Sequence, residues 1–193
     1  MTNYEIEQRA NAMLTKYVDS GSVHKAWDKI MTGENIKYRQ INTANPGFVG
    51  ALTKGTNGQS YIMTNAAISN EGRRNFTIAH ELGHYALKHN LHSGSLFCGS
   101  DGIMEEGNAS LVIEREANYF ATYLLMPEEK IKKAFFSMLR NSRRVYRKDF
   151  LPVQKNTFGV WCGIRDNLTK RYGVSEEALR NRLRSLGLVQ FYF

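Results

Sequence analysis

The pentapeptide His80-Glu81-Leu82-Gly83-His84 constrains this chain more than any other feature of its sequence. Residues four apart on a helix share a face, with Cβ atoms roughly 5–6 Å apart. That separation allows two imidazoles to bind one Zn²⁺ ion at about 2.0–2.1 Å. Glu81 is rotated from His80 by about 100°, because a helix has roughly 3.6 residues per turn. The spacing therefore predicts two metal ligands and a general base that acts on a water molecule held by the ion.

The sequence on either side of the pentapeptide favours a helix. Phe76-Thr77-Ile78-Ala79 precedes it, Tyr85-Ala86-Leu87-Lys88-His89 follows it, and no proline interrupts either stretch. Gly83 is the one weak helix former, and its missing side chain would let another element approach the histidines closely. The alternative is a chance match on a packed helix, expected in on the order of 1 in 100 chains of this size. We therefore expect a metal site here.

A catalytic zinc site usually has three protein ligands and one position for water. No third histidine follows at the extended zincin spacing, because His84 is followed by Tyr-Ala-Leu-Lys-His-Asn. A predicted helix over 113–125 offers Glu114 and Glu116 instead. Face geometry favours Glu114, because Asn118 lies four residues on and could hydrogen-bond a ligand histidine, whereas Glu116 points elsewhere. The alternative for either glutamate is a solvated surface charge.

These segments together resemble the ImmA/IrrE family of metallopeptidases. The resemblance is carried by Phe76-Thr77-Ile78-Ala79-His80-Glu81-Leu82-Gly83-His84, by Glu114-x-Glu116-Ala117-Asn118-x-Phe120-Ala121 and by Leu124-Leu125-Met126-Pro127, and it is dense over residues 73–127. It implies a gluzincin-like zinc peptidase of bacteria and their mobile elements, which typically cleaves a helix-turn-helix repressor and so releases a set of genes. It also implies that Glu114, the first glutamate of the second motif, is the third ligand.

The residues and the resemblance together predict how such an enzyme works. His80, His84 and Glu114 would bind Zn²⁺, with Asn118 behind a ligand histidine and one position left for water. The ion would lower the pKa of that water, and Glu81 would take its proton and pass it to the leaving amine.

Composition fits one compact unit, or a catalytic domain with a small appendage, in a chain of 193 residues of which 42% are hydrophobic. No apolar run approaches the roughly 20 residues of a membrane span, and the polar N-terminal segment is unlike a signal peptide. Cys98 and Cys162 are too few and too widely spaced for a disulfide framework or a zinc knuckle. A ligand or switch role for Cys98 is the less favoured alternative to a small buried hydrophobe. We expect a cytoplasmic protein, and the family resemblance implies a bacterial one.

The net charge of +8 is concentrated towards the C-terminus. Residues 1–127 hold 11 Lys and Arg against 12 Asp and Glu, a balance of −1, while residues 128–193 hold 15 against 6, a balance of +9. Such a basic region favours an anionic partner, either DNA or an acidic protein substrate, although solvated helix faces also carry charge runs.

Two helices are predicted in this basic region, near 159–172 and 176–186. The Gly173-Val174-Ser175 turn between them is similar to that of a helix-turn-helix, and Arg180, Arg182 and Arg184 decorate the second helix. The alternative, which we favour, is an ordinary helical hairpin that packs its leucines onto the catalytic domain.

Periodicity predicts the remaining elements. We expect helices over 4–19 and 127–141, short strands over 36–41, 47–52 and 59–64, irregular chain over 142–158 and a Gly/Ser-rich loop over 93–112. His89 and His92 flank this loop and are expected to be polar helix-end residues rather than ligands. The apolar tail over 189–193 is expected to dock on the body or on a partner.

The predicted fold class is α+β. A zincin-like metallopeptidase core with a small β-sheet and the HExxH helix would occupy residues 1–141, and a basic helical C-terminal segment residues 142–193. The predicted function is a zinc-dependent endopeptidase that cleaves a helix-turn-helix repressor and derepresses genes of a mobile element or a stress response. The alternatives are a different metal hydrolase and a non-catalytic zincin fold that binds DNA, a repressor or a toxin. The presence of Glu81 argues against the non-catalytic reading, because binding alone would not need it.

Overall fold

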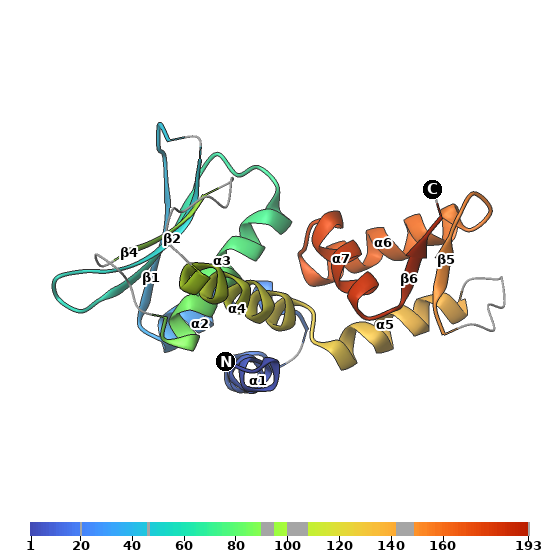
Figure 1. Cartoon of the computed structure of the whole chain (residues 1–193), viewed down its shortest axis with the longest axis horizontal. Helices are drawn as coiled ribbons and strands as arrows, with labels where there is room; N and C mark the ends of the chain where they lie inside the picture. The colour runs from blue at the N-terminus through green and yellow to red at the C-terminus, as the bar shows by residue number, and fades with distance from the viewer. Residues whose placement is uncertain (20, 46, 90–94, 100–107, 142–148, 193) are drawn as a thin grey trace.

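The computed structural model describes residues 1–19, 21–45, 47–89, 95–99, 108–141 and 149–192 (Figure 1). The fold is α+β, as predicted. Its elements in chain order are α1 (Asn3–Tyr17), a 3₁₀ turn (Val23–Lys25), α2 (Trp27–Gly33), β1 (Ile36–Ile41), β2 (Phe48–Lys54), β3 (Ser60–Asn65), α3 (Glu71–Leu87), β4 (Ser95–Gly99), α4 (Asn108–Leu125), α5 (Glu128–Asn141), β5 (Leu151–Val153), α6 (Phe158–Tyr172), α7 (Glu176–Ser185) and β6 (Val189–Phe191).

A four-stranded sheet in the order β1-β3-β2-β4 forms one end of the molecule. β2 pairs antiparallel with both β3 and β4, whereas β1 runs parallel to β3. The turn between β2 and β3 uses Gly58 at φ +79°, a conformation that glycine adopts without steric penalty. The three predicted strands therefore exist, with ends within two residues of the expected ones.

Three helices are layered beside this sheet. α3 packs on β2 and β3, α4 packs on α3, and α1 packs on α4. α4 turns an apolar stripe to the core, with zero exposure for Ala117, Phe120, Ala121 and Leu124. The apolar positions of α1 are buried in the same core: Ile6, Ala10, Met13, Leu14 and Tyr17. The helix that carries the pentapeptide is therefore held between the sheet and a second helix.

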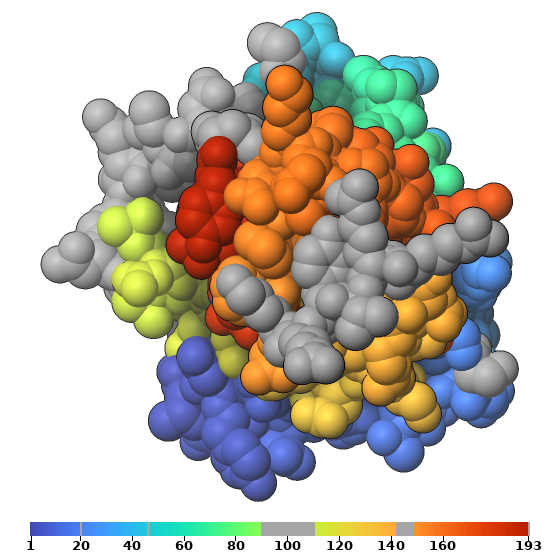
Figure 2. Space-filling view, turned by 90° about the vertical axis from the view of Figure 1, so that its right-hand side faces the viewer, coloured from blue at the N-terminus to red at the C-terminus, as the bar shows by residue number. Residues whose placement is uncertain are grey.

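The C-terminal elements α5, α6, α7, β5 and β6 gather at the other end of the molecule (Figure 1). In Figure 2 they face the viewer in orange and red, with α1 in dark blue below them. Leu179 and Leu183 of α7 belong to the same buried core as Ile6 of α1. The hairpin of α6 and α7 therefore packs on the body of the protein.

Two predictions about irregular chain need correction. Residues 142–158 were expected to be irregular, but Leu151–Val153 form β5, whose parallel partner is β6 in the tail. A pair of three-residue strands carries too little alternation to be seen in sequence. The tail thus docks on the body through pairing of β6 with β5, and Phe191 packs edge-on against Trp161 at 5.1 Å between ring centroids.

The predicted loop over 93–112 is also partly wrong. Ser95–Gly99 form the edge strand β4, and α4 begins at Asn108 rather than near 113. The remainder of that loop, with His92, lies outside the described residues. Cys98 stands in β4 opposite Gly50 of β2, and Cys162 is a free, partly buried thiol. Within the described ranges, no helix is both long and apolar enough to cross a membrane.

Candidate metal centre

The histidine pair is built by α3. The helix begins where the Asn70 side chain accepts a hydrogen bond from the backbone N–H of Arg73 at 2.9 Å. It ends at Lys88, which adopts the left-handed conformation at φ 59°. Between these ends His80 and His84 face the protein interior, with exposures of 4% and 1%. The spacing of four residues has placed both rings on one buried face.

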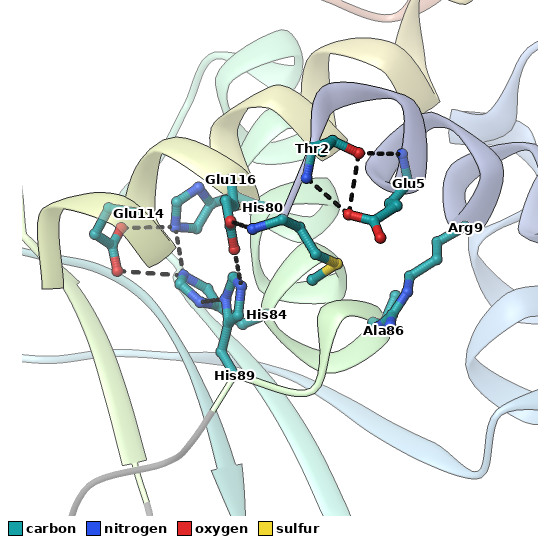
Figure 3. A network of polar contacts seen from close by, with 10 residues as sticks. Thr2, Glu5, Arg9, His80, His84, Ala86, His89, Glu114 and Glu116 are labelled. Carbon is teal, nitrogen blue, oxygen red and sulfur yellow. Dashed lines mark hydrogen bonds and ion pairs between the residues drawn. The ribbon is translucent and has the colours of Figure 1, made fainter. Parts of the chain in front are cut away.

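Glu114 reaches both histidines from α4 (Figure 3). Its Oε2 lies 3.1 Å from Nε2 of His80 and its Oε1 lies 3.3 Å from Nε2 of His84. The two Nε2 atoms are 2.9 Å apart. The structure therefore brings together the three residues that the sequence singled out as ligands.

Gly83 lets α4 come this close. A Cβ atom there would lie 3.1 Å from both Cα and the carbonyl oxygen of Ala117, and 3.3 Å from the ring of Phe120. These separations are tighter than ordinary van der Waals contact, so a larger residue would push α4 and Glu114 away from the histidines. The sequence predicted that Gly83 would let another element approach the histidines closely, and α4 is that element.

The donor set fits a tetrahedral metal ion. Candidate ligand atoms of His80, His84 and Glu114 all lie within 4.8 Å of one another. Four ligands at about 2.0–2.1 Å from a zinc ion would be separated by about 3.3–3.5 Å, close to the 2.9–3.3 Å between the nearest atoms of the three side chains. Both Nε2 atoms point at the shared carboxylate, which is the arrangement that a cation between them would require.

The outward nitrogen of His80 has a partner as well. Its Nδ1 lies 2.9 Å from Oδ1 of Asn118, one turn along α4 from Glu114. If Nε2 is the ligand atom, Nδ1 carries the proton and donates it to the amide oxygen. Asn118 is thus placed to fix both the ring orientation and the tautomer of His80.

His84 has a longer chain of partners, which the sequence analysis missed. Its Nδ1 lies 2.8 Å from Nδ1 of His89, and Nε2 of His89 lies 3.1 Å from Oε2 of Glu116. The amino group of Met1 contacts the other oxygen of Glu116 (Figure 3). Glu116 does point away from the three-residue cluster, but it is connected to the cluster through His89. His89 is more than a polar helix-end residue, because its ring supports His84.

A local turn places His89 there. The N–H of His89 donates to the carbonyl of His84 at 3.0 Å, and the N–H of Lys88 donates to the carbonyl of Tyr85 at 3.1 Å. These two bonds are the Schellman arrangement, in which the chain folds back over the last turn of a helix. Glycine usually marks the left-handed position of this motif in a sequence. Here that position holds Lys88, so nothing in the sequence indicated that His89 folds back over the helix.

The electrostatics favour a cation between the three side chains. Burial would raise the pKa of Glu114, but the two histidines hold it well below its ordinary value. Burial lowers the pKa of His84, which keeps that imidazole neutral. Burial acts the same way on His80, but the hydrogen bond and charge of Glu114 outweigh it and raise the pKa. A divalent metal ion would take the place of the proton that the raised pKa lets His80 hold, and an ionised carboxylate with two imidazole nitrogens is then a suitable donor set.

Glu81 lies on the neighbouring face of α3, towards the sheet. It is fully buried, and a Cβ atom on Gly50 of β2 would lie 3.1 Å from its Oε1. Tyr85, which follows His84 on α3, donates its hydroxyl proton to the carbonyl oxygen of Glu34 at 3.2 Å. Glu81 is therefore held next to the histidines, while Tyr85 is committed elsewhere.

An α+β fold with a His-His-Glu cluster shared by two packed helices defines a class of proteins that can hold a metal ion. The chain belongs to the IrrE N-terminal-like domain family of peptidases, whose family model matches residues 33–184. This confirms the family membership that the motifs predicted.

Other comparisons bear on the fold alone. A solved structure of a Mycobacterium tuberculosis transcriptional regulator superposes with a TM-score of 0.54 at 16% sequence identity. The superposition covers 93% of this chain but 47% of the regulator, so this chain spans about half the length of that protein. No curated protein matches the chain.

Proposed function

We propose that this protein is a zinc-dependent endopeptidase that cleaves a helix-turn-helix transcriptional repressor and so derepresses genes of a mobile element or a stress response. The observation that carries the proposal is the Glu114 carboxylate, which lies 3.1 and 3.3 Å from the inward nitrogens of His80 and His84. Membership in a peptidase family supports it. A small metal hydrolase with another substrate would share these ligands, so the product of the reaction is the deciding evidence.

Each residue has a distinct part in the proposed reaction. His80, His84 and Glu114 would hold the zinc ion, and Asn118 and His89 would orient the two histidines. A bound zinc ion would acidify a water molecule and polarise the peptide carbonyl. Glu81, buried beside the cluster, would take the proton of the attacking water and return it to the leaving amine.

The substrate class rests on two lines of support. The family resemblance implies repressor cleavage, and a structural neighbour is a transcriptional regulator. We assign substrate recognition to the basic segment 142–193, whose described residues lie at the end of the molecule opposite the sheet, and the zincin-like catalytic core to residues 1–141. Cleavage of a repressor would place the protein in the bacterial cytoplasm.

The experiment pairs Glu81→Gln with the wild-type chain, both loaded with zinc. The substrate to test is a small helix-turn-helix protein whose gene lies beside the gene of this chain. We expect Glu81→Gln to keep the fold and about one zinc ion per chain, but to cleave at least about 100-fold more slowly, because an amide cannot take a proton from water. Normal turnover by the zinc-loaded variant would refute the mechanism.

A second function is favoured by the +9 charge balance of residues 128–193. In it, the chain binds DNA or a repressor and cleaves nothing. Stoichiometric binding of such a repressor by wild-type and Glu81→Gln protein alike, with no cleavage by either, would support this second function.

A further inference from the structure

A hollow of about 850 Å³ opens between α3, α4 and α7, close to the candidate metal centre but outside it. Phe76 in its lining lies one helical turn from His80 on α3, and Thr122 lies one turn from Asn118 on α4. Sites of roughly 300–1,000 Å³ hold ligands of drug size, so a short peptide segment fits this one. Its lining residues are Asn70, Arg73, Phe76, Thr122, Ser175, Glu177, Ala178, Asn181, Arg182 and Ser185.

The lining divides into a polar rim and a floor that is rich in carbon. The exposed members of the lining are all polar: Asn70, Arg73, Glu177, Asn181 and Ser185. Three of the four partly buried members carry apolar surface, namely the ring of Phe76, the methyl group of Ala178 and Cγ2 of Thr122. Protein interfaces seat a large apolar or aromatic side chain in pockets of this kind, where a polar rim surrounds a floor that excludes water.

Contacts within the chain hold the walls of the hollow in place. A Cβ atom on Gly72, in the first turn of α3, would overlap the backbone of Val174 and Ser175, so the start of α7 lies directly against α3. Arg182 joins α7 to the end of α4, because its Nε donates to the carbonyl of Met126 at 3.2 Å. The hollow is therefore preformed, and a ligand would bind without the cost of ordering its walls.

One face of α4 leads from the metal centre to the hollow. Glu114, Asn118 and Thr122 follow one another at intervals of four residues; Asn118 is exposed and the other two are partly exposed. Glu114 and Thr122 are separated by about 12 Å along the helix, at roughly 1.5 Å per residue. An extended chain rises about 3.3 Å per residue, so a peptide lying along this face covers that distance in about four residues.

The rim carries one charge of each sign on two different walls. Arg73 belongs to α3 and Glu177 to α7, and within the described residues neither side chain is part of an ion pair. A peptide with an acidic residue towards α3 and a basic residue towards α7 would complement both charges, which would fix the direction in which it lies.

We infer that this hollow receives a large apolar side chain of the protein substrate, about four residues from the bond that is cleaved. The inference rests on the proposed peptidase function, because the metal centre beside the hollow identifies its occupant as substrate. Two observations carry it further than that function: the carbon-rich floor beneath a polar rim, and the exposed face of α4 that joins the hollow to Glu114. Thr122 and Ala178 are then residues that determine specificity.

The first test measures binding without cleavage. It uses full-length, zinc-loaded Glu81→Gln protein and a small helix-turn-helix protein whose gene lies beside the gene of this chain. Ala178→Trp in this background fills the floor of the hollow and should weaken binding at least about tenfold in a calorimetric titration, the effect of losing an anchor side chain. Lys170→Trp, exposed on α6 outside the lining, is the matched control and should bind as its parent does. Equal zinc content and unfolding temperature in both variants would exclude misfolding as the cause.

A crosslink tests the position without filling the hollow. With p-benzoylphenylalanine in place of Asn181 on the rim, irradiation should join the Glu81→Gln chain to a repressor residue about four positions from the bond that wild type cleaves. Mass spectrometry locates both positions. Replacing the large apolar repressor residue nearest the crosslink with alanine should weaken binding to the parent chain about tenfold. It should cause no further loss with Ala178→Trp, because both changes remove the same contact.

The outcomes separate this inference from the proposed function. If wild type cleaves the repressor but Ala178→Trp binds it as tightly as its parent, the inference is wrong and the peptidase stands. A crosslink more than about ten residues from the cleaved bond has the same meaning, because an extended chain of that length is too long for the distance along α4. If Ala178→Trp loses binding but wild type cleaves nothing, the hollow is the anchor site for a repressor and the peptidase is refuted.

Two other occupants of the hollow give different results. Loss of repressor binding in Arg73→Gln, with unchanged binding in Ala178→Trp, would show that the hollow selects an acidic group and not an apolar one. Binding of a short DNA duplex that Ala178→Trp abolishes, with unchanged binding of the repressor, would show a nucleic-acid surface. Either result refutes the inference.

Discussion

Nδ1 of His84 lies 2.8 Å from Nδ1 of His89, a residue just beyond the end of the same helix. If Nε2 of His84 is a ligand atom, its Nδ1 donates a proton and Nδ1 of His89 accepts it, which leaves Nε2 of His89 protonated and able to donate to Glu116. Each hydrogen bond in this chain is then donated in the same direction, from His84 to His89 and from His89 to Glu116. Such supports fix the tautomer of a metal ligand and strengthen it as a donor.

Replacing His89 with alanine should weaken zinc binding by about 10–100-fold, the usual effect of removing such a support. A competition titration with a chromogenic chelator would measure it. Gln can donate and accept in place of the imidazole, so His89→Gln should recover part of the affinity. Lys133→Ala, at an exposed position on α5, should change nothing. Equal zinc affinity in His89→Ala and wild type would contradict the proposed role.

The two glutamates of α4 should differ sharply. Glu114→Ala removes a proposed ligand and should abolish stoichiometric zinc binding. Glu116→Ala removes only the partner of His89, so zinc binding should persist with affinity reduced by about tenfold or less. Zinc content after gel filtration tests both variants, and the reverse order of effects would show that the ligand has been misassigned.

Gly50 should be required for the position of Glu81. An alanine methyl there would overlap Cγ2 of Thr77 on α3 and press on Oε1 of Glu81. We expect Gly50→Ala to lower the free energy of unfolding by about 1–3 kcal/mol, as overpacking usually does. Thr77→Ser removes Cγ2 but keeps the hydroxyl that donates to the carbonyl of Arg73. The double variant should regain part of the lost stability in urea unfolding. If it regains none, the overlap with Cγ2 of Thr77 is not the cause of the destabilisation.

Glu34 should contribute stability that depends on pH. Burial raises its pKa, but hydrogen bonds from Tyr17 and Lys16 outweigh burial and lower the pKa below its ordinary 4.5. A carboxyl group with a lowered folded-state pKa stabilises the protein above its unfolded pKa and loses that effect as pH falls through the folded pKa.

The stability of wild type should therefore fall more steeply than that of Glu34→Gln as the pH is lowered below about 4.5. At neutral pH the variant should be less stable by about 1 kcal/mol. Urea unfolding across the pH range measures both. Glu129→Gln, on the exposed face of α5, is the control and should follow the wild-type pH dependence. If the free energy of unfolding of Glu34→Gln and wild type changed with pH in the same way, Glu34 would make no pH-dependent contribution to stability.

Much of this fold could be predicted because its main elements carry strong periodic signals. The helices of His80 and Glu114 and the three strands β1, β2 and β3 were found from the spacing of apolar residues. β4, β5, β6 and the seven-residue α2 were missed, because short elements hold too few repeats and are stabilised by partners far away in sequence.

The candidate site shows the same limit. The two histidines and Glu114 could be inferred because each lies at a fixed helical spacing within a motif. His89 could not, because its role depends on a left-handed lysine that turns the chain back over α3. Arg182 was placed on the surface because its neighbours Arg180 and Arg184 are charged, whereas the face that α7 presents to α4 is set by tertiary packing.

The basic C-terminal segment should act in association with the substrate rather than in catalysis. Arg184 is exposed, and Arg180 lies with its guanidinium carbon 4.4 Å from the ring centroid of Phe191 in β6. Reversing both arginines to glutamate should leave zinc content unchanged and slow repressor cleavage mainly through a higher KM. The defect should shrink at high salt, because ions screen the steering of an acidic partner. Arg184→Glu alone is the control for a loss of packing at Phe191, because Arg184 makes no such contact in the described structure. If cleavage by both variants at low salt equalled that of wild type, these arginines would be part of a solvated helix face and nothing more.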